Sequence, residues 1–396
     1  MIGISKLYMG TVEPSDALRY GRHSASLPGH LLQFSKDKKP VVVWNCTRAC
    51  NLRCVHCYAS SDGRCADNEL SFDEGRELID NLADFGVPVL LFSGGEPLCR
   101  KDMPELAKYA VSKGMRAVVS TNGTLITDKM AERLKLVGLS YVGVSLDGMQ
   151  VVNDKFRGVE HAFERALEGI RACKRAGIKV GLRYTLTRYN IDELPAIFQL
   201  LADENIPRVC FYHLVSTGRG SEIQAANLTD EQSRAAIDEI IDRTAEMHRR
   251  GEPIEVLTVD NHCDGPYLYL RLLRENRAER AEKVMELLEM NGGNSTGRGI
   301  GCVSWDGTVY PDQFWRHHPV GNVRTRTFGE IWSDPENTLL TQLREKPKFV
   351  QGRCRTCRFL DVCGGNFRAR GEAATGDVWG VDPACYLTDE EIALPG

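Results

Sequence analysis

Six short apolar runs lie between residues 41 and 215, and a stretch with helical periodicity separates each run from the next. Apolar runs that alternate with amphipathic stretches are typical of βα units built around a parallel sheet. The sequence therefore predicts an α/β fold. The predicted strands are 41–45, 88–93, 116–120, 141–146, 179–187 and 208–215.

The stretches between the runs carry signals for helix ends. Ser71 and Glu74 have the spacing of a capping box, and Gly86 stands where that helix is expected to end. A second apolar stripe begins at Phe163 and includes Cys173, which we therefore expect to be a buried thiol. These signals support helices between the predicted strands.

The first apolar run leads into three cysteines, Cys50, Cys54 and Cys57, separated by three and then two residues. Three thiolates from one loop can hold three irons of a cubane iron–sulfur cluster and leave the fourth iron open to a ligand. The alternative is a zinc loop or a set of buried thiols, because C-x2-C alone is common in zinc sites. The spacing after an apolar strand favours the cluster.

The second apolar run ends in Gly94, Gly95, Glu96 and Pro97, where backbone groups and one acid can approach a polar ligand closely. Together with the cysteine loop, this stretch resembles the radical S-adenosylmethionine (SAM) enzymes. The resemblance implies a partial (βα)6 barrel of the TIM type, in which ligands sit at the C-terminal ends of the strands.

Membership of that family further implies that SAM binds to the open iron and that the Gly94–Glu96 stretch contacts its amino group. An electron from the cluster would cleave SAM to methionine and a 5′-deoxyadenosyl radical, which takes a hydrogen atom from the substrate. The cofactor would supply this chemistry, and the protein would supply orientation and exclusion of water. A low-potential donor such as flavodoxin or ferredoxin is the expected source of the electron.

Polar residues follow the third and fourth predicted strands, and the resemblance makes them candidates for contacts to SAM. These are Asn122, then Ser145 and Asp147, and later Arg157, which is placed like the arginine that pairs with the SAM carboxylate in related enzymes. Leu214, at the end of the sixth strand, is expected to face adenine. Taken singly, such residues are more often turn residues or surface arginines, but their positions at successive strand ends favour contacts to the cofactor.

Further candidates for catalysis or substrate contact stand near the sixth strand and beyond it. Tyr212 and His213 end that strand, and Arg219 follows. His262 lies in a polar cluster, residues 260–265, for which a turn with a solvated histidine is the alternative reading.

Four cysteines near the end of the chain form a second pattern: Cys354, Cys357, Cys363 and Cys385. Four cysteines can close one [4Fe-4S] cluster, although alone they would equally suit structural zinc. Behind a radical SAM barrel they resemble the SPASM extension, whose full pattern has seven cysteines and two clusters.

Two departures from the full SPASM pattern predict that this chain has one auxiliary cluster. Asp312 and Phe367 stand where further cysteine ligands would be, and Cys302 alone cannot hold a cluster. We therefore expect two [4Fe-4S] clusters in all, one that binds SAM and one auxiliary. The remaining cysteines, Cys46, Cys65, Cys99, Cys210 and Cys263, match no ligand pattern and are expected to be incidental thiols.

The space freed by the missing inner cluster is a candidate substrate site. Arginines can pair with carboxylates, aromatic faces can stack, and a histidine can bind iron. The candidates there are Asp312, Trp315, Arg316, His317 and His318, with Arg219 and Arg298 nearby. The catalytic candidates are Tyr212, His213, His262 and His317.

Residues 1–16 and 307–314 resemble one SPASM subgroup, whose members act on iron tetrapyrroles. Membership of this subgroup implies removal of acetate side chains from 12,18-didecarboxysirohaem to give iron-coproporphyrin III. Three alternatives remain open. They are an enzyme of the haem d1 pathway acting on the same type of pigment, a peptide-modifying SPASM enzyme, and a zinc-binding scaffold without catalysis.

We expect four segments along the chain: an N-terminal extension (1–40), a radical SAM barrel (41–225), a helical connector (226–293) and a SPASM-like domain with one auxiliary cluster (294–396). The extension is expected to be irregular and packed on the barrel. In an alternative reading, its basic residues, among them Arg19, Arg22 and His23, help to close the substrate pocket.

The composition of the 396 residues limits the possible partners. A formal net charge of −4 argues against a general nucleic-acid binder, and no apolar run reaches the roughly 18 residues of a membrane span. The first residues lack the features of a signal peptide. In a cytoplasmic protein, which we expect this to be, 14 cysteines indicate metal ligands and buried thiols, not disulfides.

Overall fold

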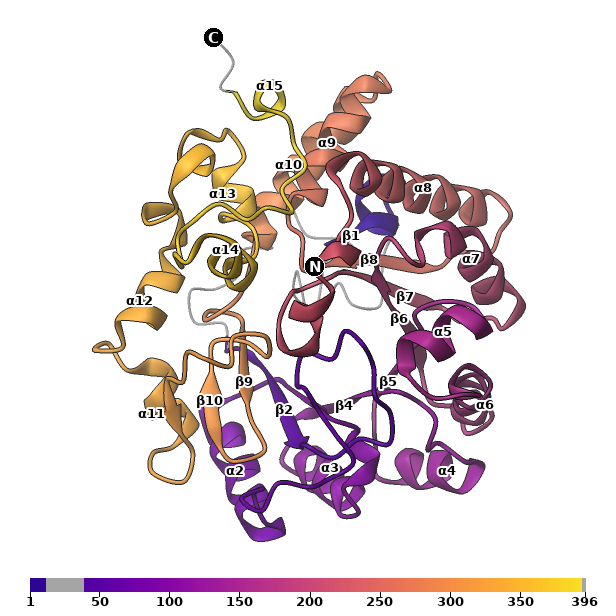
Figure 1. Cartoon of the computed structure of the whole chain (residues 1–396), viewed down its shortest axis with the longest axis vertical. Coiled ribbons are helices and arrows are strands. Elements are labelled where there is room, and N and C mark those ends of the chain that lie inside the picture. The colour runs from indigo at the N-terminus through magenta and orange to yellow at the C-terminus, as the bar shows by residue number, and fades with distance from the viewer. Residues whose placement is uncertain (12–38, 394–396) are drawn as a thin grey trace.

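The computed structural model describes residues 1–11 and 39–393. Its centre is one 11-stranded sheet with the strand order β1-β8-β7-β6-β5-β4-β3-β2-β9-β10-β11. The strands from β2 to β8 run parallel to one another in sequence order, and β9 lies parallel to β2 on the other side. The sheet curves but stays open, so it forms a partial barrel (Figure 1).

All six predicted strands are confirmed. They are β2 (Val41–Thr47), β3 (Val89–Gly94), β4 (Arg116–Thr121), β5 (Tyr141–Ser145), β6 (Val180–Leu186) and β7 (Arg208–His213). The helices between them are α2 (Phe72–Phe85), α3 (Met103–Ser112), α4 (Asp128–Leu136), α5 (Gln150–Arg157), α6 (Ala162–Arg175) and α7 (Leu194–Asp203). These helices surround the strands on the outside (Figure 1), and the predicted capping box of Ser71 and Glu74 begins α2.

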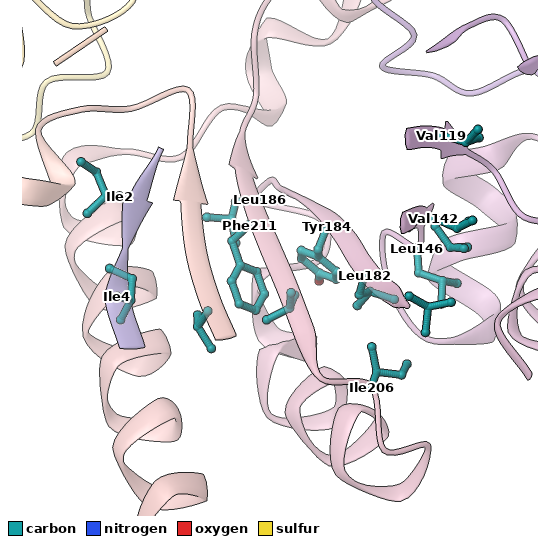
Figure 2. Packing of buried hydrophobic residues seen from close by; sticks show 14 of the residues in the cluster. Ile2, Ile4, Val119, Val142, Leu146, Leu182, Tyr184, Leu186, Ile206 and Phe211 are labelled. Atoms are coloured by element: carbon teal, nitrogen blue, oxygen red, sulfur yellow. The ribbon is translucent and has the colours of Figure 1, made fainter. Parts of the chain in front are cut away.

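The core lies between the strands and these helices. In β6, Leu182 and Tyr184 point toward the helices, where they pack beside Phe211 of β7 (Figure 2). Because side chains alternate along a strand, the residue between them, Arg183, points into the barrel. The outer face is therefore the apolar core, and the inner face is free to carry polar groups.

The segment 226–293, predicted to be a helical connector, also contains a strand. Between α8 (Asp230–Arg249) and α9 (Asp264–Arg274), the buried strand β8 (Glu255–Val259) pairs in parallel with β7. The helix α10 (Ala278–Asn291) follows. The prediction was wrong here because five apolar-rich residues between two long helices give little periodicity of their own, and pairing with β7 decides their structure.

The start of the chain is also regular where we expected an irregular extension. Strand β1 (Ile2–Gly3) pairs antiparallel with β8, and a π-helical turn (Ser5–Met9) follows. The rest of the predicted extension up to residue 38, including Arg19, Arg22 and His23, lies outside the described residues.

The C-terminal part continues the same sheet. Strand β9 (Ile300–Val303) adds to β2, and β10 (Thr308–Tyr310) and β11 (Gly321–Asn322) follow antiparallel. The helices α11 (Phe328–Ser333), α12 (Thr338–Arg344), α13 (Leu360–Cys363), α14 (Arg368–Thr375) and α15 (Asp389–Ile392) complete this part, at the left and top of Figure 1. Within residues 1–11 and 39–393, no helix is long and apolar enough to span a membrane.

Candidate functional site

Cys50, Cys54 and Cys57 lie in the loop that follows β2, and all three are free thiols. Burial raises the pKa of the Cys50 thiol to about 12, and the neighbouring Cys54 and Cys57 add to the rise. Three thiols this close become stable thiolates only when a metal group binds them. The donor set therefore fits a cluster held by three cysteines.

The end of α5 holds this cysteine loop through backbone hydrogen bonds. Arg53 donates its N–H to the carbonyl of Arg157 at 3.1 Å, and Val55 donates to Phe156 at 2.9 Å. At Gly158, φ is +68° and an added Cβ would lie 2.6 Å from the Arg53 carbonyl oxygen. Glycine is thus needed where the helix ends against the loop.

The predicted SAM contacts Gly94 and Gly95 pack directly against the chain that enters the cysteine loop. Gly95 donates its N–H to the Thr47 carbonyl at 2.8 Å. An added Cβ would lie 2.5 Å from the Thr47 oxygen at Gly94 and 2.1 Å from the Ala49 oxygen at Gly95. The two glycines therefore set the distance between β3 and the loop.

Glu96 is fully buried and joins the ends of β3 and β4. Its carboxylate accepts hydrogen bonds from the Thr121 hydroxyl at 2.7 Å, the Asn122 N–H at 2.8 Å and the Leu98 N–H at 3.0 Å. Burial raises its pKa, although these donors oppose the rise. Asn122 in turn donates its amide to Asn51 in the cysteine loop at 2.9 Å.

Asp147 and Arg157 form a buried ion pair beside the cysteine loop. The Asp147 carboxylate contacts Arg157 and, at 3.2 Å, His56, and it accepts the Thr185 N–H at 2.7 Å. Burial alone would raise the pKa of Asp147, but Arg157 and His56 hold it well below its usual value. The other end of the Arg157 guanidinium donates to the Cys54 sulfur at 3.6 Å.

The last two predicted SAM contacts also lie at strand ends. Ser145 ends β5 and is partly exposed, and Leu214, just after β7, is buried. The Leu214 carbonyl accepts a hydrogen bond from Arg370 at 3.3 Å. The candidates thus gather along the ends of β3, β4, β5 and β7, as the sequence predicts for a ligand site of a parallel barrel.

Arg219 and Arg316, predicted to bind substrate, hold the cysteine loop instead. Arg219 donates to the carbonyls of Cys54 at 2.9 Å and Ser61 at 2.7 Å. Arg316 donates to the Ala59 carbonyl at 3.0 Å, and its guanidinium lies over the Trp305 ring. Neither residue lines the large cavity described below.

The four C-terminal cysteines, predicted to hold one cluster, are all free thiols, and they act on one another's pKa. Burial raises the pKa of Cys354 to about 11, and Cys385 and Cys357 add to the rise. Burial and the thiols of Cys385 and Cys354 likewise hold the pKa of Cys363 well above its usual value. Four mutually close thiols fit one fully cysteine-ligated cluster.

Cys263, which the sequence suggests is incidental, lies against this C-terminal group. Its sulfur is 3.7 Å from the Ala384 carbonyl, and the hydrogen bond that its thiol makes to Cys385 lowers the pKa of Cys385. No spacing rule could show this, because Cys263 comes from the segment between β8 and α9.

The positions that lack inner-cluster ligands have other partners. Asp312 accepts hydrogen bonds from the Thr296 hydroxyl at 2.6 Å and from the Phe314 N–H at 2.9 Å. Phe367 is buried and meets Phe314 edge-on, with ring centroids 5.5 Å apart. Cys302 is buried, and the Asn45 amide donates to its sulfur at 3.5 Å. Asp312 and Phe367 are thus engaged by protein groups where the full SPASM pattern has cysteine ligands.

The concave side of the sheet encloses a cavity of about 1800 Å³. Inward-facing residues of the strands from β2 to β8 form one wall, and the segments 291–300 and 312–314 form the other. Four predicted site residues line it: Tyr212, His262, Arg298 and Asp312. Burial holds the pKa of His262 well below its usual value, so this histidine is neutral at pH 7.

The other predicted catalytic and substrate residues do not line the cavity. His213 is buried and bonds to Asp264 at 3.0 Å. Trp315 is fully buried and donates its indole N–H to Glu372 at 2.5 Å, and His317 and His318 each contact the same carboxylate at 2.8 Å. These four residues have tertiary partners in place of the cavity, and the ligand atoms of His317, His318 and Glu372 lie within 4.8 Å of one another, so that this group could hold a metal ion.

Comparison with known proteins agrees with this geometry. The model of the radical SAM superfamily matches residues 44–201, and the SPASM model, an iron-sulfur cluster-binding domain, matches residues 296–358. Fe-coproporphyrin III synthase of Methanosarcina barkeri is 64% identical over 395 residues, which is 99% of each chain. The chain belongs to the radical SAM superfamily.

A second radical SAM relative is the pre-heme d1 synthase of Dinoroseobacter shibae, 42% identical over 89% of this chain and 87% of its own. Among solved structures, SuiB of Streptococcus suis bound to precursor peptide SuiA has a TM-score of 0.69 at 17% identity, over 88% of this chain and 76% of that one. This likeness supports the fold. The protein is a radical SAM enzyme that uses a [4Fe-4S] cluster and SAM, with auxiliary iron–sulfur binding in its SPASM domain.

Proposed function

We propose that this chain is an Fe-coproporphyrin III synthase, which removes two acetate side chains from 12,18-didecarboxysirohaem. The observation that carries the proposal is the 64% identity to the Methanosarcina barkeri protein of that name, over 99% of both chains. The cavity adds support, because about 1800 Å³ exceeds the roughly 300–1,000 Å³ of common small-molecule pockets. A large planar macrocycle needs such a space.

Cys50, Cys54 and Cys57 would hold the SAM-binding cluster, and the strand-end residues from Gly94 to Leu214 would orient SAM. When bound, the cluster and SAM supply the 5′-deoxyadenosyl radical that takes a hydrogen atom from an acetate methylene of the substrate. Asp147 keeps Arg157 beside Cys54, so that a positive charge stays next to this thiolate.

Cys354, Cys357, Cys363 and Cys385 would hold a single auxiliary [4Fe-4S] cluster, which gives two clusters per chain. The hydrogen bonds of Asp312 and the packing of Phe367 support this number. We assign the delivery of electrons to a low-potential donor such as flavodoxin or ferredoxin. The substrate is an iron tetrapyrrole, and the cavity next to Asp312 and Arg298 is where we place it.

The deciding experiment is anaerobic incubation of the protein with SAM, a reductant and 12,18-didecarboxysirohaem, followed by mass spectrometry of the pigment. Loss of two acetate groups with formation of 5′-deoxyadenosine is expected. The Cys54→Ala protein is the matched control and should leave the pigment unchanged.

The same experiment tests a second candidate, which the 42% identity to pre-heme d1 synthase favours over more distant activities. A pigment of a different mass, formed together with 5′-deoxyadenosine, would assign the chain to that branch. Unchanged pigment with active SAM cleavage would contradict both functions.

A further inference from the structure

Two glycines in the middle of strands make room for large side chains inside the barrel. An added Cβ at Gly143 of β5 would lie 2.3 Å from Nε of Arg183, and one at Gly181 of β6 would lie 2.2 Å from the Tyr141 hydroxyl. A glycine inside a strand often marks such a close approach. The Arg183 guanidinium therefore lies across Gly143, on the inner face of the sheet.

Arg183 lines the cavity and has few protein partners. Its Nη1 donates to the Tyr212 hydroxyl at 3.0 Å, and its guanidinium lies 5.7 Å from the centre of that ring. Its Nε has no hydrogen-bond partner, and no carboxylate in residues 1–11 and 39–393 pairs with it. Burial raises the pKa of the Tyr212 phenol, so the phenol is neutral and cannot balance the charge.

Two other arginines lie on the same inner face. Arg208 pairs with Glu255 at 3.5 Å, whereas Arg116 bonds to the Ser140 hydroxyl at 3.0 Å but begins β4, at the end of the strands far from the predicted SAM contacts. An enclosed guanidinium without a counter-charge is costly unless a ligand supplies one. A guanidinium also offers paired donors that match a carboxylate. Arg183 is therefore the inner-face arginine best suited to an anionic ligand.

Arg183 lies near the end of the barrel at which the predicted SAM contacts gather. It pairs in register with Ser145, a predicted SAM contact, and the N–H of Thr185, two residues further, bonds to Asp147. At about 3.3 Å per residue, the backbone of Arg183 lies about 7 Å below that bond. A ligand held by Arg183 would thus be directly beneath the strand ends.

We propose that Arg183, held by Tyr212 over Gly143, binds a carboxylate of the tetrapyrrole inside the barrel. The inference rests on the proposed function and deepens it, because it names the group that anchors the substrate. It assigns to Arg183 the role that the sequence suggested for Arg219 and Arg316.

The test is a titration of Fe-coproporphyrin III into wild type and Arg183→Gln, followed by the Soret band. Loss of one partner of a desolvated charge pair typically costs at least about 2 kcal/mol, so the affinity of Arg183→Gln should fall about 30-fold or more. Arg116→Gln is the matched control: it lines the same cavity at the far end of the strands, and its affinity should stay within about twofold. Iron content reports whether each variant is folded.

A second arm keeps the test valid if Arg183→Gln does not fold. Tyr212→Phe removes only the hydroxyl that holds the guanidinium and should weaken binding about fivefold, the effect of one hydrogen bond. Methyl esters of Fe-coproporphyrin III should bind wild type more weakly than the free acid. That difference should largely vanish in Arg183→Gln.

The outcomes separate the two claims. Wild-type affinity in Arg183→Gln, or in Tyr212→Phe together with equal binding of acid and ester by wild type, would overturn the role of Arg183 while the synthase activity stands. Failure of wild type to bind the pigment or to convert 12,18-didecarboxysirohaem would overturn the proposed function, and the anchor with it.

Discussion

The cysteine loop of the barrel has three thiols and is held mainly by groups from distant parts of the chain, whereas the C-terminal group has four thiols and combines local turns with contacts from Cys263 and Asn294. The end of α5, Arg219 and Arg316 all bond to the first loop. In the second centre, Cys357 donates its N–H to the Cys354 carbonyl at 3.2 Å, and Cys385 donates to Asp382 at 3.2 Å.

The two constructions suit different tasks. A centre with one thiol too few leaves a coordination position for a ligand, and its loop has to be aligned with a cofactor bound by other strands. A centre with four thiols, and with Cys263 packed against them, is closed, so it needs no alignment with a ligand bound elsewhere. We expect SAM cleavage to be sensitive to changes in the distant groups that hold the barrel loop, and the iron of the C-terminal centre to depend mainly on its own ligands.

The largest expected effect comes from removing one ligand of the three-cysteine centre in the barrel. In Cys54→Ala, two thiolates cannot retain the cluster, so 5′-deoxyadenosine formation under dithionite should be abolished. Iron should fall from about eight to about four per chain, because the auxiliary cubane remains. SAM cleavage at the wild-type rate would remove the cysteine loop from the site.

Removing one ligand of the C-terminal centre should release the irons of that centre only. We expect Cys357→Ala to lose about four irons per chain, one cubane's worth. Cys302→Ala is the control and should keep all of them, since its thiol accepts a hydrogen bond from the Asn45 amide and belongs to neither cysteine pattern. About twelve irons in the wild type would mean that an inner cluster is present.

Breaking the ion pair between Asp147 and Arg157 tests whether the cysteine loop of the barrel depends on groups outside the loop. Asp147→Asn leaves the Arg157 charge buried without its partner, which typically costs about 3–5 kcal/mol. Both the unfolding temperature and the rate of SAM cleavage should fall. Asp382→Asn breaks the buried pair with Arg370 beside the C-terminal centre, and we expect it to lower stability while leaving SAM cleavage measurable.

The smallest effect is a pH dependence at Asp260, in the cavity wall between the two centres. Burial raises the pKa of Asp260 to about 7, although Arg370 opposes the rise. A raised folded pKa means that stability is full below the unfolded value of about 4 and is lost as pH rises toward 7. The advantage of Asp260→Asn in unfolding free energy should therefore grow from pH 5 to 7 and level off above it.

The expected plateau for Asp260→Asn is on the order of 3 kcal/mol, from about three pKa units less the effect of neighbouring charges. Asparagine suits the site because φ is +66° there, and this residue tolerates the left-handed region. Thermal unfolding of both proteins across that pH range measures the difference. A constant difference would show that Asp260 does not titrate in this window.

The strands were predictable because they depend on local patterns, and alternating apolar runs identified those from β2 to β7. Cysteine spacing likewise singled out seven thiols, whose role as cluster ligands stays a prediction. Strand β8 was missed because its five residues take their structure from pairing with β7.

The arginines were assigned poorly for a related reason. In a sequence, an arginine that binds carbonyls, such as Arg219, looks the same as one that faces a cavity, such as Arg183. Only the fold separates them. The signal that was available for Arg183 is Gly143, a mid-strand glycine over which the Arg183 side chain lies, and its meaning depends on the register between β5 and β6, in which Arg183 itself pairs with Ser145.

The position of β2 between β3 and β9 has a consequence for folding during synthesis on the ribosome. Until residue 303 of 396 has left the ribosome, the apolar strand Val41–Thr47 lacks its partner on one side. An unpaired apolar edge is a template for aggregation. The sheet around β2 therefore cannot be completed until late in synthesis. A shortened protein that ends before β9 would expose the same unpaired, apolar edge of β2 to solvent.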